Sequence, residues 1–389
     1  MIQLDFEKFK GFSIKDKAAS DYMNAASDLA ISQILINEQE DASQSVPVPP
    51  MTPPEAARRY CLLLLIVTLI AIPACIRLGC SDFFLHHGAS IWVQSNDAVF
   101  NMRDRDCDVL IFGDSTAMTG IDPDVVERNT GLKTCNISVT NAVLAVTHNL
   151  TLDSFLENNM KPRVLLIQLS PDGFQPESKD WSQTVYPEGL LELLRHGNPA
   201  RVRHVLLTHP QEAIAFAGYA AGFSLYAGIK DVWFHLTNMR PEEDTVSVHN
   251  GFFTPPAPPT KSCEPGATFS NPAAGGTFPR SVVEEYEKNY AGRSGVVLVN
   301  VAPIPSCDAN LAAFSSELNG VTSNALLPLP VTLFNDPRHY TAIGSAVVSK
   351  VVADELNAVA QHNPQIEDNS PPSAPRTVAS LLQTHLGRR

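Results

Sequence analysis

The stretch Asp108-Val-Leu-Ile-Phe-Gly-Asp-Ser115 decides the fold expected for this chain. Its apolar residues predict a short buried strand, and the glycine after them permits a sharp turn that leaves Ser115 at the carboxyl end of the strand. Ligands of parallel α/β sheets bind at that edge. A helix that begins there directs backbone N–H groups toward an anionic oxygen. The stretch therefore predicts a serine placed at a ligand-binding edge.

Further apolar runs follow this strand and alternate with helical patterns. The runs lie at 134–139, 163–169 and 295–301, and helical patterns at 122–129 and 142–158 separate the first three strands. Apolar strands interleaved with helices are typical of a parallel sheet that is covered on both faces. We therefore expect an α/β fold.

A second motif, Asn335-Asp-Pro-Arg-His-Tyr340, precedes a helical pattern at 342–356. A serine hydroxyl is a weak nucleophile until a histidine takes its proton, and the histidine needs an acceptor that fixes its tautomer. Asp336, three residues before His339 on one tight turn, can be that acceptor. Either motif alone is weak, because Asp and Ser after a strand also cap ordinary helices. Their order and their positions at element junctions make the pair informative.

With Gly113-Asp114-Ser115 near its start and Asp336-x-x-His339 near its end, the region 106–360 resembles the SGNH/GDSL hydrolase superfamily. Membrane-tethered members of this superfamily include acyltransferase-like proteins that modify cell-surface polysaccharides. The resemblance implies a flavodoxin-like three-layer α/β/α sandwich. It also implies that Ser115 is the nucleophile, His339 the general base and Asp336 its orienting acid, with the backbone N–H of Ser115 donating to the oxyanion.

The chain departs from the superfamily's pattern at two oxyanion positions. The second block usually carries a glycine, where this chain has Asn141, and the third block usually offers an asparagine, which Leu169-Ser-Pro-Asp-Gly-Phe174 lacks. Asn141 or Ser170 would have to contribute instead. Loss of one oxyanion donor costs about 10²–10³ in rate. A reduced, an altered and an absent activity all stay open.

The region at about 176–290 has no counterpart in this resemblance. Its first half has helical character, and residues 213–229 carry no charge. That uncharged stretch fits either a second membrane span or close helix packing. A single extra crossing would leave Ser115 and His339 on opposite sides of the membrane, where they could not meet. We therefore expect a helical and loop insertion of the kind that forms a lid or a substrate wall.

The flanking composition divides the chain into four segments. Residues 1–57 are a polar N-terminal tail with a Pro-rich linker, and 58–80 are a transmembrane anchor or a signal-like segment. Residues 81–361 are the SGNH-like domain with its insertion, and 362–389 are a C-terminal tail.

The anchor is expected because the run from Tyr60 to Ile76 is uncharged. A bilayer span takes about 17–25 apolar residues, and this run lies at the short end of that range. Arg58 and Arg59 precede the run and Arg77 alone follows it, which favours a cytoplasmic N-terminus. The domain would then be extracytoplasmic, in the periplasm or outside the cell, on a single-pass membrane protein.

A second interpretation of this segment starts translation at Met51. The following residues would then be a charged leader and the apolar region of a signal peptide. Cys75 after Ala74 would resemble a lipoprotein cleavage site, although Pro73 fits that pattern poorly. Both interpretations deliver the rest of the chain across a membrane, and the choice between anchor and cleaved signal is open.

Composition and charge exclude several classes of function. The 389 residues are 44% hydrophobic and 18% charged, which is too apolar for a disordered protein. The 28 basic and 41 acidic residues leave a net charge of −13 without a clustered basic face, which argues against nucleic-acid binding. The seven cysteines show no spacing typical of a zinc site. We expect no metal and no organic cofactor.

Two cysteine pairs suggest disulfides. Cys107 and Cys135 stand at two strands that should be neighbours in the sheet, and Cys263 could pair with Cys307. An oxidising compartment would allow both bonds. Buried free thiols are the alternative for each pair.

These features favour a membrane-anchored serine esterase or O-acyltransferase that acts on a cell-envelope polysaccharide, with a membrane acyl-transfer protein as a possible partner. Ser115 would attack an ester carbonyl with the help of His339, and the acyl group would pass to water or to a sugar hydroxyl. One alternative is a secreted esterase of small or lipid esters. Another is a catalytically silent relative that binds carbohydrate or scaffolds an envelope complex, which the missing third-block asparagine supports.

Overall fold

A computed structural model describes most of the region between residues 53 and 362. The described residues are 53–82, 85, 91–174, 187–208, 210–211, 216–218, 229, 236–237, 250–255, 259–260, 280–318, 320–336 and 338–362. The chain divides into two units, Met1–Thr68 and Leu69–Arg389.

Four parallel strands form the centre of the second unit. They are β1 (Val109–Gly113), β2 (Thr134–Asn136), β3 (Val164–Leu169) and β4 (Val296–Val301). The order across the sheet is β2-β1-β3-β4, and Leu110 of β1 lies between Cys135 and Leu165. Every residue of β1, β2 and β3 is buried. This burial pattern is typical of a parallel sheet with both faces covered, and the expected α/β fold is confirmed.

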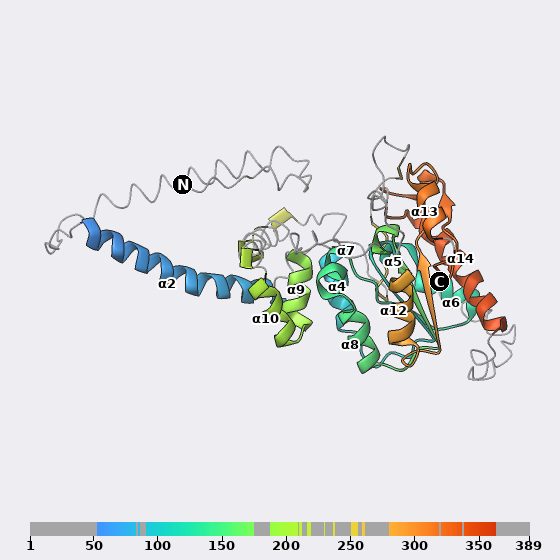
Figure 1. The fold of residues 1–389 in the computed structure, drawn as a ribbon, viewed down its shortest axis with the longest axis horizontal. Helices are drawn as coiled ribbons and strands as arrows, with labels where there is room; N and C mark the ends of the chain where they lie inside the picture. Colours follow the sequence, from blue (N-terminus) through green and yellow to red (C-terminus); the bar gives the residue numbers. More distant parts are fainter. Residues whose placement is uncertain are drawn as a thin grey trace. The chain divides into compact units, whose positions relative to one another are not determined.

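Helices pack on both faces of the sheet (Figure 1). One face packs against helices α8 (Leu150–Asn158), α12 (Arg280–Tyr290) and α13 (Leu311–Leu318). The opposite face packs against α5 (Ser115–Gly120), α6 (Pro123–Thr130) and α14 (Ala342–His362). Because successive strand residues point to opposite faces, Leu110 joins the first of these cores and Ile111 the second.

The described residues form further helices, turns and strands in addition to these. They are α2 (Pro53–Gly79), α4 (Ile91–Phe100), α7 (Asn141–Thr147), the 3₁₀ turn η2 (Pro171–Phe174), α9 (Pro187–His196), α10 (Pro199–Thr208), β5 (Ile304–Pro305), β6 (Pro328–Leu329) and the 3₁₀ turn η5 (Val331–Leu333). The two short strands β5 and β6 pair with each other in parallel.

Side chains hydrogen-bond to the backbone groups along the outer edge of β4, the last strand of the sheet. Ser323 Oγ accepts the backbone N–H of Val299 at 2.9 Å, and Asn324 Oδ1 accepts that of Val301 at 2.8 Å. The Nδ2 of Asn324 donates in return to the carbonyl of Val301 at 3.0 Å. An open strand edge invites pairing with another chain, and these contacts use the groups that such pairing requires.

A disulfide joins Cys107 to Cys135, with the two Cα atoms 5.9 Å apart. It connects the residue pair for which the sequence left a disulfide and two buried free thiols open, and the structure has the disulfide. Cys307 is also disulfide-bonded, and Cys263, its expected partner, lies outside the described residues. Cys61, Cys75 and Cys80 are free thiols.

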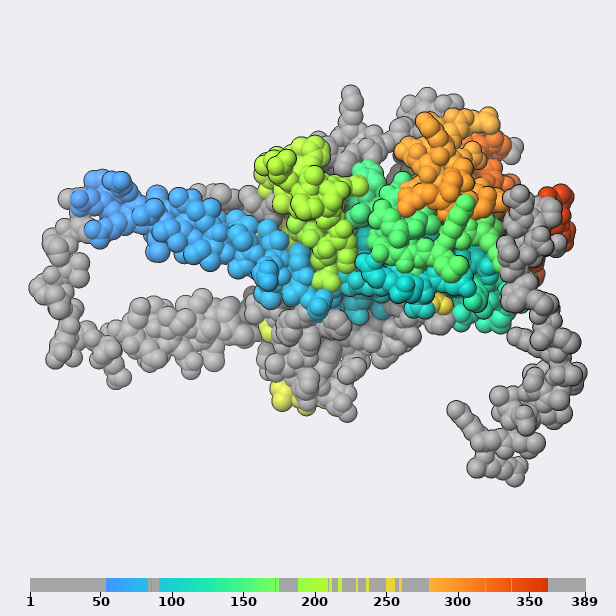
Figure 2. All heavy atoms as spheres, turned by 90° about the horizontal axis from the view of Figure 1, so that it is seen from below, coloured from blue at the N-terminus to red at the C-terminus, as the bar shows by residue number. Residues whose placement is uncertain are grey.

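Helix α2 contains the apolar run expected to form the anchor. Its segment Pro54–Gly79, blue in Figure 2, has a mean hydropathy of 2.6 and none of its apolar window is buried. Apolar side chains such as Leu62, Leu65 and Leu69 are exposed, whereas Ile76 near its end packs against a buried cluster. Among the described residues it is the one helix long and apolar enough to cross a membrane. Pro73 lies within the helix. Most of 213–229, the alternative span, lies outside the described residues.

Candidate active site

Asp114 fixes the turn that places the serine. Its Oδ1 accepts the backbone N–H of Thr116 at 2.9 Å and thereby caps α5. Its Oδ2 accepts the backbone N–H of Ser170 at 2.8 Å. The Asp114 side chain is buried, so it ties the start of α5 to the end of β3 rather than facing a substrate.

Gly113 allows β1 and β3 to approach closely just before this turn. A Cβ atom at Gly113 would lie 1.8 Å from the carbonyl oxygen of Gln168, which no side chain can tolerate. The glycine of the Gly-Asp-Ser motif is therefore required by contact with the neighbouring strand, and Ser115 follows as the first residue of α5.

The three residues expected to form a triad lie together. His339 Nε2 is 3.0 Å from Ser115 Oγ across 224 positions of sequence, and His339 Nδ1 is 2.7 Å from Asp336 Oδ2. A base that faces the nucleophile with one ring nitrogen and an acid with the other is the arrangement of Ser-His-Asp hydrolases. The site therefore has the geometry to deprotonate a serine hydroxyl.

Asp336 is held as a carboxylate. Its Oδ1 accepts the backbone N–H groups of Arg338 and His339 at 2.7 and 2.8 Å. Burial alone would raise the pKa of Asp336, but the hydrogen bond and charge of His339 together with these backbone donors hold it below its ordinary value. An ionised Asp336 fixes the Nδ1–H tautomer of His339 and stabilises the imidazolium that forms when Nε2 takes a proton.

An aromatic residue borders His339, and a second aromatic residue packs against the first. The ring of Trp92, on α4, lies 4.9 Å from that of His339, and Phe253 packs edge-on against Trp92 at 4.7 Å. Sequence reasoning missed both residues. The sequence contained one sign of this contact, the tryptophan in the segment before the first strand. Aromatic residues are so common in ordinary protein cores that this position alone does not indicate a site.

The donors expected for an oxyanion are the backbone N–H of Ser115 and the side chain of Asn141. Ser115 is the first residue of a helix, where backbone N–H groups have no partner within the helix. Asn141 is exposed at the start of α7, and the N–H of Val139 donates to the carbonyl of Gly113 at 3.0 Å, so this segment runs beside β1. No hydrogen bond joins Asn141 to Ser115 in the described part of the chain.

The backbone of Ser170, the other expected oxyanion donor, contacts Asp114. Its backbone N–H already donates to Asp114, so that group is not available to an oxyanion. The roles assigned from the sequence to Asn141 and Ser170 stay predictions. One group of three potential metal ligands, Asp97, Glu192 and His196, occurs in the described residues, and none of its members belongs to the triad.

No protein-family model matches the chain, and comparison with curated proteins and with solved structures gives no match. The resemblance to SGNH/GDSL hydrolases therefore rests on the two motifs and on the geometry of Ser115, His339 and Asp336.

Proposed function

We propose that this protein is a membrane-anchored serine esterase or O-acyltransferase of the SGNH/GDSL type that acts on acyl esters of a cell-envelope glycan. The observation that carries the proposal is the contact chain from Ser115 Oγ through His339 to Asp336, at 3.0 and 2.7 Å. A flavodoxin-like three-layer sandwich belongs to the same proposal. The parallel order β2-β1-β3-β4 and the helices on both sheet faces support it.

The reaction proceeds through an acyl-enzyme. Ser115 Oγ attacks the ester carbonyl carbon while His339 Nε2 takes the hydroxyl proton, and the N–H of Ser115 donates to the oxyanion that forms. The intermediate collapses, and the alcohol leaves with the proton of His339. Water or a sugar hydroxyl then attacks the acyl-enzyme, His339 takes its proton, and Ser115 is released with that proton. Asp336 stabilises the imidazolium in both halves.

An extracytoplasmic location completes the proposal. Arg58 and Arg59 precede the apolar run of α2 while Arg77 alone follows it, which favours a cytoplasmic N-terminus. The disulfide between Cys107 and Cys135 supports the same orientation, because such bonds persist in oxidising compartments. The site would then face envelope polysaccharide and could receive acyl groups from a membrane acyl-transfer partner.

A fluorophosphonate probe tests the activated serine directly. The full chain in detergent should become labelled, and Ser115→Ala and His339→Ala should each abolish labelling, because the probe requires a nucleophile with its base. Ser154→Ala is the matched control, since Ser154 lies on α8, away from the triad contacts. A folded wild-type protein that takes no label refutes the mechanism and favours the carbohydrate-binding alternative.

The acceptor requires a second measurement on the same protein. Release of nitrophenol from nitrophenyl acetate should depend on Ser115, and mass spectrometry of an added oligosaccharide should show acetylated sugar if the enzyme is a transferase. Rapid release with no acylated sugar would support the simple esterase alternative.

A further inference from the structure

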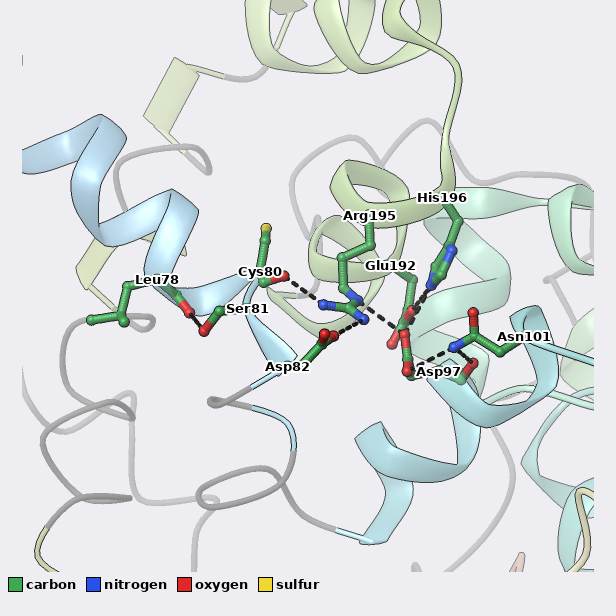
Figure 3. A network of polar contacts seen from close by, with 9 residues as sticks. All are labelled: Leu78, Cys80, Ser81, Asp82, Asp97, Asn101, Glu192, Arg195 and His196. Carbon is green, nitrogen blue, oxygen red and sulfur yellow. Dashed lines mark hydrogen bonds and ion pairs between the residues drawn. The ribbon is translucent and has the colours of Figure 1, made fainter.

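A cluster of charged side chains lies where α4 meets α9, close to the end of α2 (Figure 3). Asp97 comes from α4, while Glu192, Arg195 and His196 come from α9. His196 Nε2 lies 2.9 Å from Asp97 Oδ1 and 3.5 Å from Glu192 Oε2. One ligand atom of each of Asp97, Glu192 and His196 lies within 4.8 Å of the other two. The cluster is separate from the contacts that assemble the triad.

Glu192 is the unusual member of this cluster. Its side chain is fully buried, and among the described residues neither carboxylate oxygen has a hydrogen-bond partner. A buried carboxylate without partners is costly. A bound proton or cation would offset the cost of burying the Glu192 carboxylate.

Arg195 does not supply this compensation, because its guanidinium is already engaged. Its Nε lies 2.9 Å from Asp97 Oδ1, its second terminal nitrogen lies 3.1 Å from Asp82 Oδ1, and its first donates to the carbonyl of Cys80. With Asp97 and Glu192 ionised and His196 neutral, the three side chains together carry two negative charges. Two negative charges match the charge of a divalent cation.

We propose that Asp97, Glu192 and His196 bind a divalent transition-metal cation, and that Zn²⁺ is the ion that fits. An imidazole nitrogen and two carboxylate oxygens are ordinary zinc ligands, and water completes a tetrahedral site with three protein ligands. Glu192 and His196 stand one turn apart on α9, so they share a helix face. On binding, the cation replaces the proton between His196 Nε2 and Asp97, and the ring proton resides on Nδ1.

Neighbouring groups hold the ligands in place, as metal ligands generally require. The imidazole of His196 stacks on Phe100 with ring centroids 4.5 Å apart and an interplanar angle of 4°. Asp97 Oδ2 accepts the Nδ2–H of Asn101 at 3.0 Å, and Arg195 remains on the other oxygen. The cation thus ties α9 to α4, the helix whose Trp92 contacts His339.

The test is zinc titration of the full chain in detergent after removal of metals with EDTA. Wild-type protein should bind one equivalent by elemental analysis and unfold at a higher temperature in its presence. Asp97→Asn and Glu192→Gln should each lower zinc affinity by at least about tenfold. Both substitutions keep the shape of the side chain, but they remove its charge and replace one acceptor oxygen with an NH₂ group that cannot bind a metal. Asp82→Asn is the control, because Asp82 contacts Arg195 but is not among the three ligands, and it should bind zinc as the wild type does.

Two results would overturn the proposal. One is a folded wild-type protein that takes up no zinc and whose unfolding temperature zinc leaves unchanged. The other is wild-type zinc affinity in both ligand variants, which would locate the bound ion elsewhere. Neither result depends on whether Ser115 is active.

Discussion

At the scale of single residues, the arrangement of the proposed triad depends on which partner each ring nitrogen of His339 faces. His339 Nδ1 faces Asp336 and Nε2 faces Ser115, so the acid and the nucleophile do not compete for one nitrogen. Two backbone N–H groups bind the other oxygen of Asp336, which aims its carboxylate at the imidazole. The reactive tautomer is therefore set by three contacts within one turn.

Asp336→Asn should lower kcat for nitrophenyl acetate by about 10³–10⁴, because an amide can donate to Nδ1 and stabilise the wrong tautomer. KM should change little, since Asp336 contacts the histidine rather than the substrate. Asp354→Asn is the control, as Asp354 is an exposed partner of Lys350 on α14. An unchanged kcat in Asp336→Asn would remove Asp336 from the mechanism.

The lowered pKa of Asp336 also predicts how stability depends on pH. A folded-state pKa below the unfolded value stabilises the fold fully above the unfolded pKa, and this contribution is lost as the pH falls through the folded pKa. Thermal unfolding from neutral to acidic pH should therefore decline less steeply in Asp336→Asn than in the wild type. Parallel curves would mean that the carboxyl has the same pKa in both states.

Gly113→Ala should destabilise the protein and misplace the nucleophile. The added Cβ meets the carbonyl of Gln168 at 1.8 Å, and overpacking of this kind costs about 1–3 kcal/mol or more. Gly292→Ala is the matched control, because nothing lies within 4 Å of its Cβ. Thermal unfolding and fluorophosphonate labelling of both variants check the expectation, and a stable, labelled Gly113→Ala protein would contradict it.

At the scale of elements, α5 is joined to two strands, to β3 at its start and to β2 along its length and just after its end. Asp114 links α5 to β3, and Asn136 at the end of β2 donates to the carbonyls of Ala117 and Ile121 at 2.9 and 3.0 Å. The second strand therefore ends at Asn136, whereas the apolar pattern suggested a strand over 134–139. The side chain of Asn136 satisfies carbonyls of α5, and the chain after it turns toward α7.

Asp114→Ala should destabilise the protein more than Asp122→Ala. Both residues cap a helix, and loss of a cap costs about 0.5–2 kcal/mol. Only Asp114 also accepts the buried N–H of Ser170, which would be left unpaired at a further cost of about 1–3 kcal/mol. Denaturant unfolding of the two variants measures the difference, and equal losses would show that the contact with Ser170 contributes nothing.

At the scale of the whole molecule, the apolar surface of α2 is the feature that predicts a membrane location. The helix exposes large side chains such as Leu65 and Leu69 at 55% and 64% of their area. Exposed apolar area of this kind is costly in water and favourable in lipid. Integration into a bilayer is therefore the expected state of the full chain.

Leu65→Arg combined with Leu69→Arg should weaken this integration. Arginine near the centre of a membrane helix costs about 2.5–3.5 kcal/mol per residue. The wild type should remain in the membrane pellet after alkaline carbonate extraction, and the double variant should move toward the supernatant. Met160→Arg with Leu207→Arg is the control, because both are exposed apolar residues outside α2. A double α2 variant that stays in the pellet would argue against a lipid-spanning helix.

The sequence by itself predicted the alternation of strands and helices and the apolar run of α2. It left the pairing of Cys107 with Cys135 open, and the meeting of Ser115, His339 and Asp336 was implied by the resemblance to a known superfamily. Periodicity, a glycine turn and the spacing of Asp336 from His339 act over a few residues, so they can be recognised without a structure. The contact between Ser115 and His339 spans 224 positions and came from the resemblance rather than from a local pattern. Only the tertiary structure decided that Trp92 borders His339 and that Asp97 meets His196 across 99 positions. Such contacts depend on how helices pack, and no local pattern encodes which polar side chains packing will bring together.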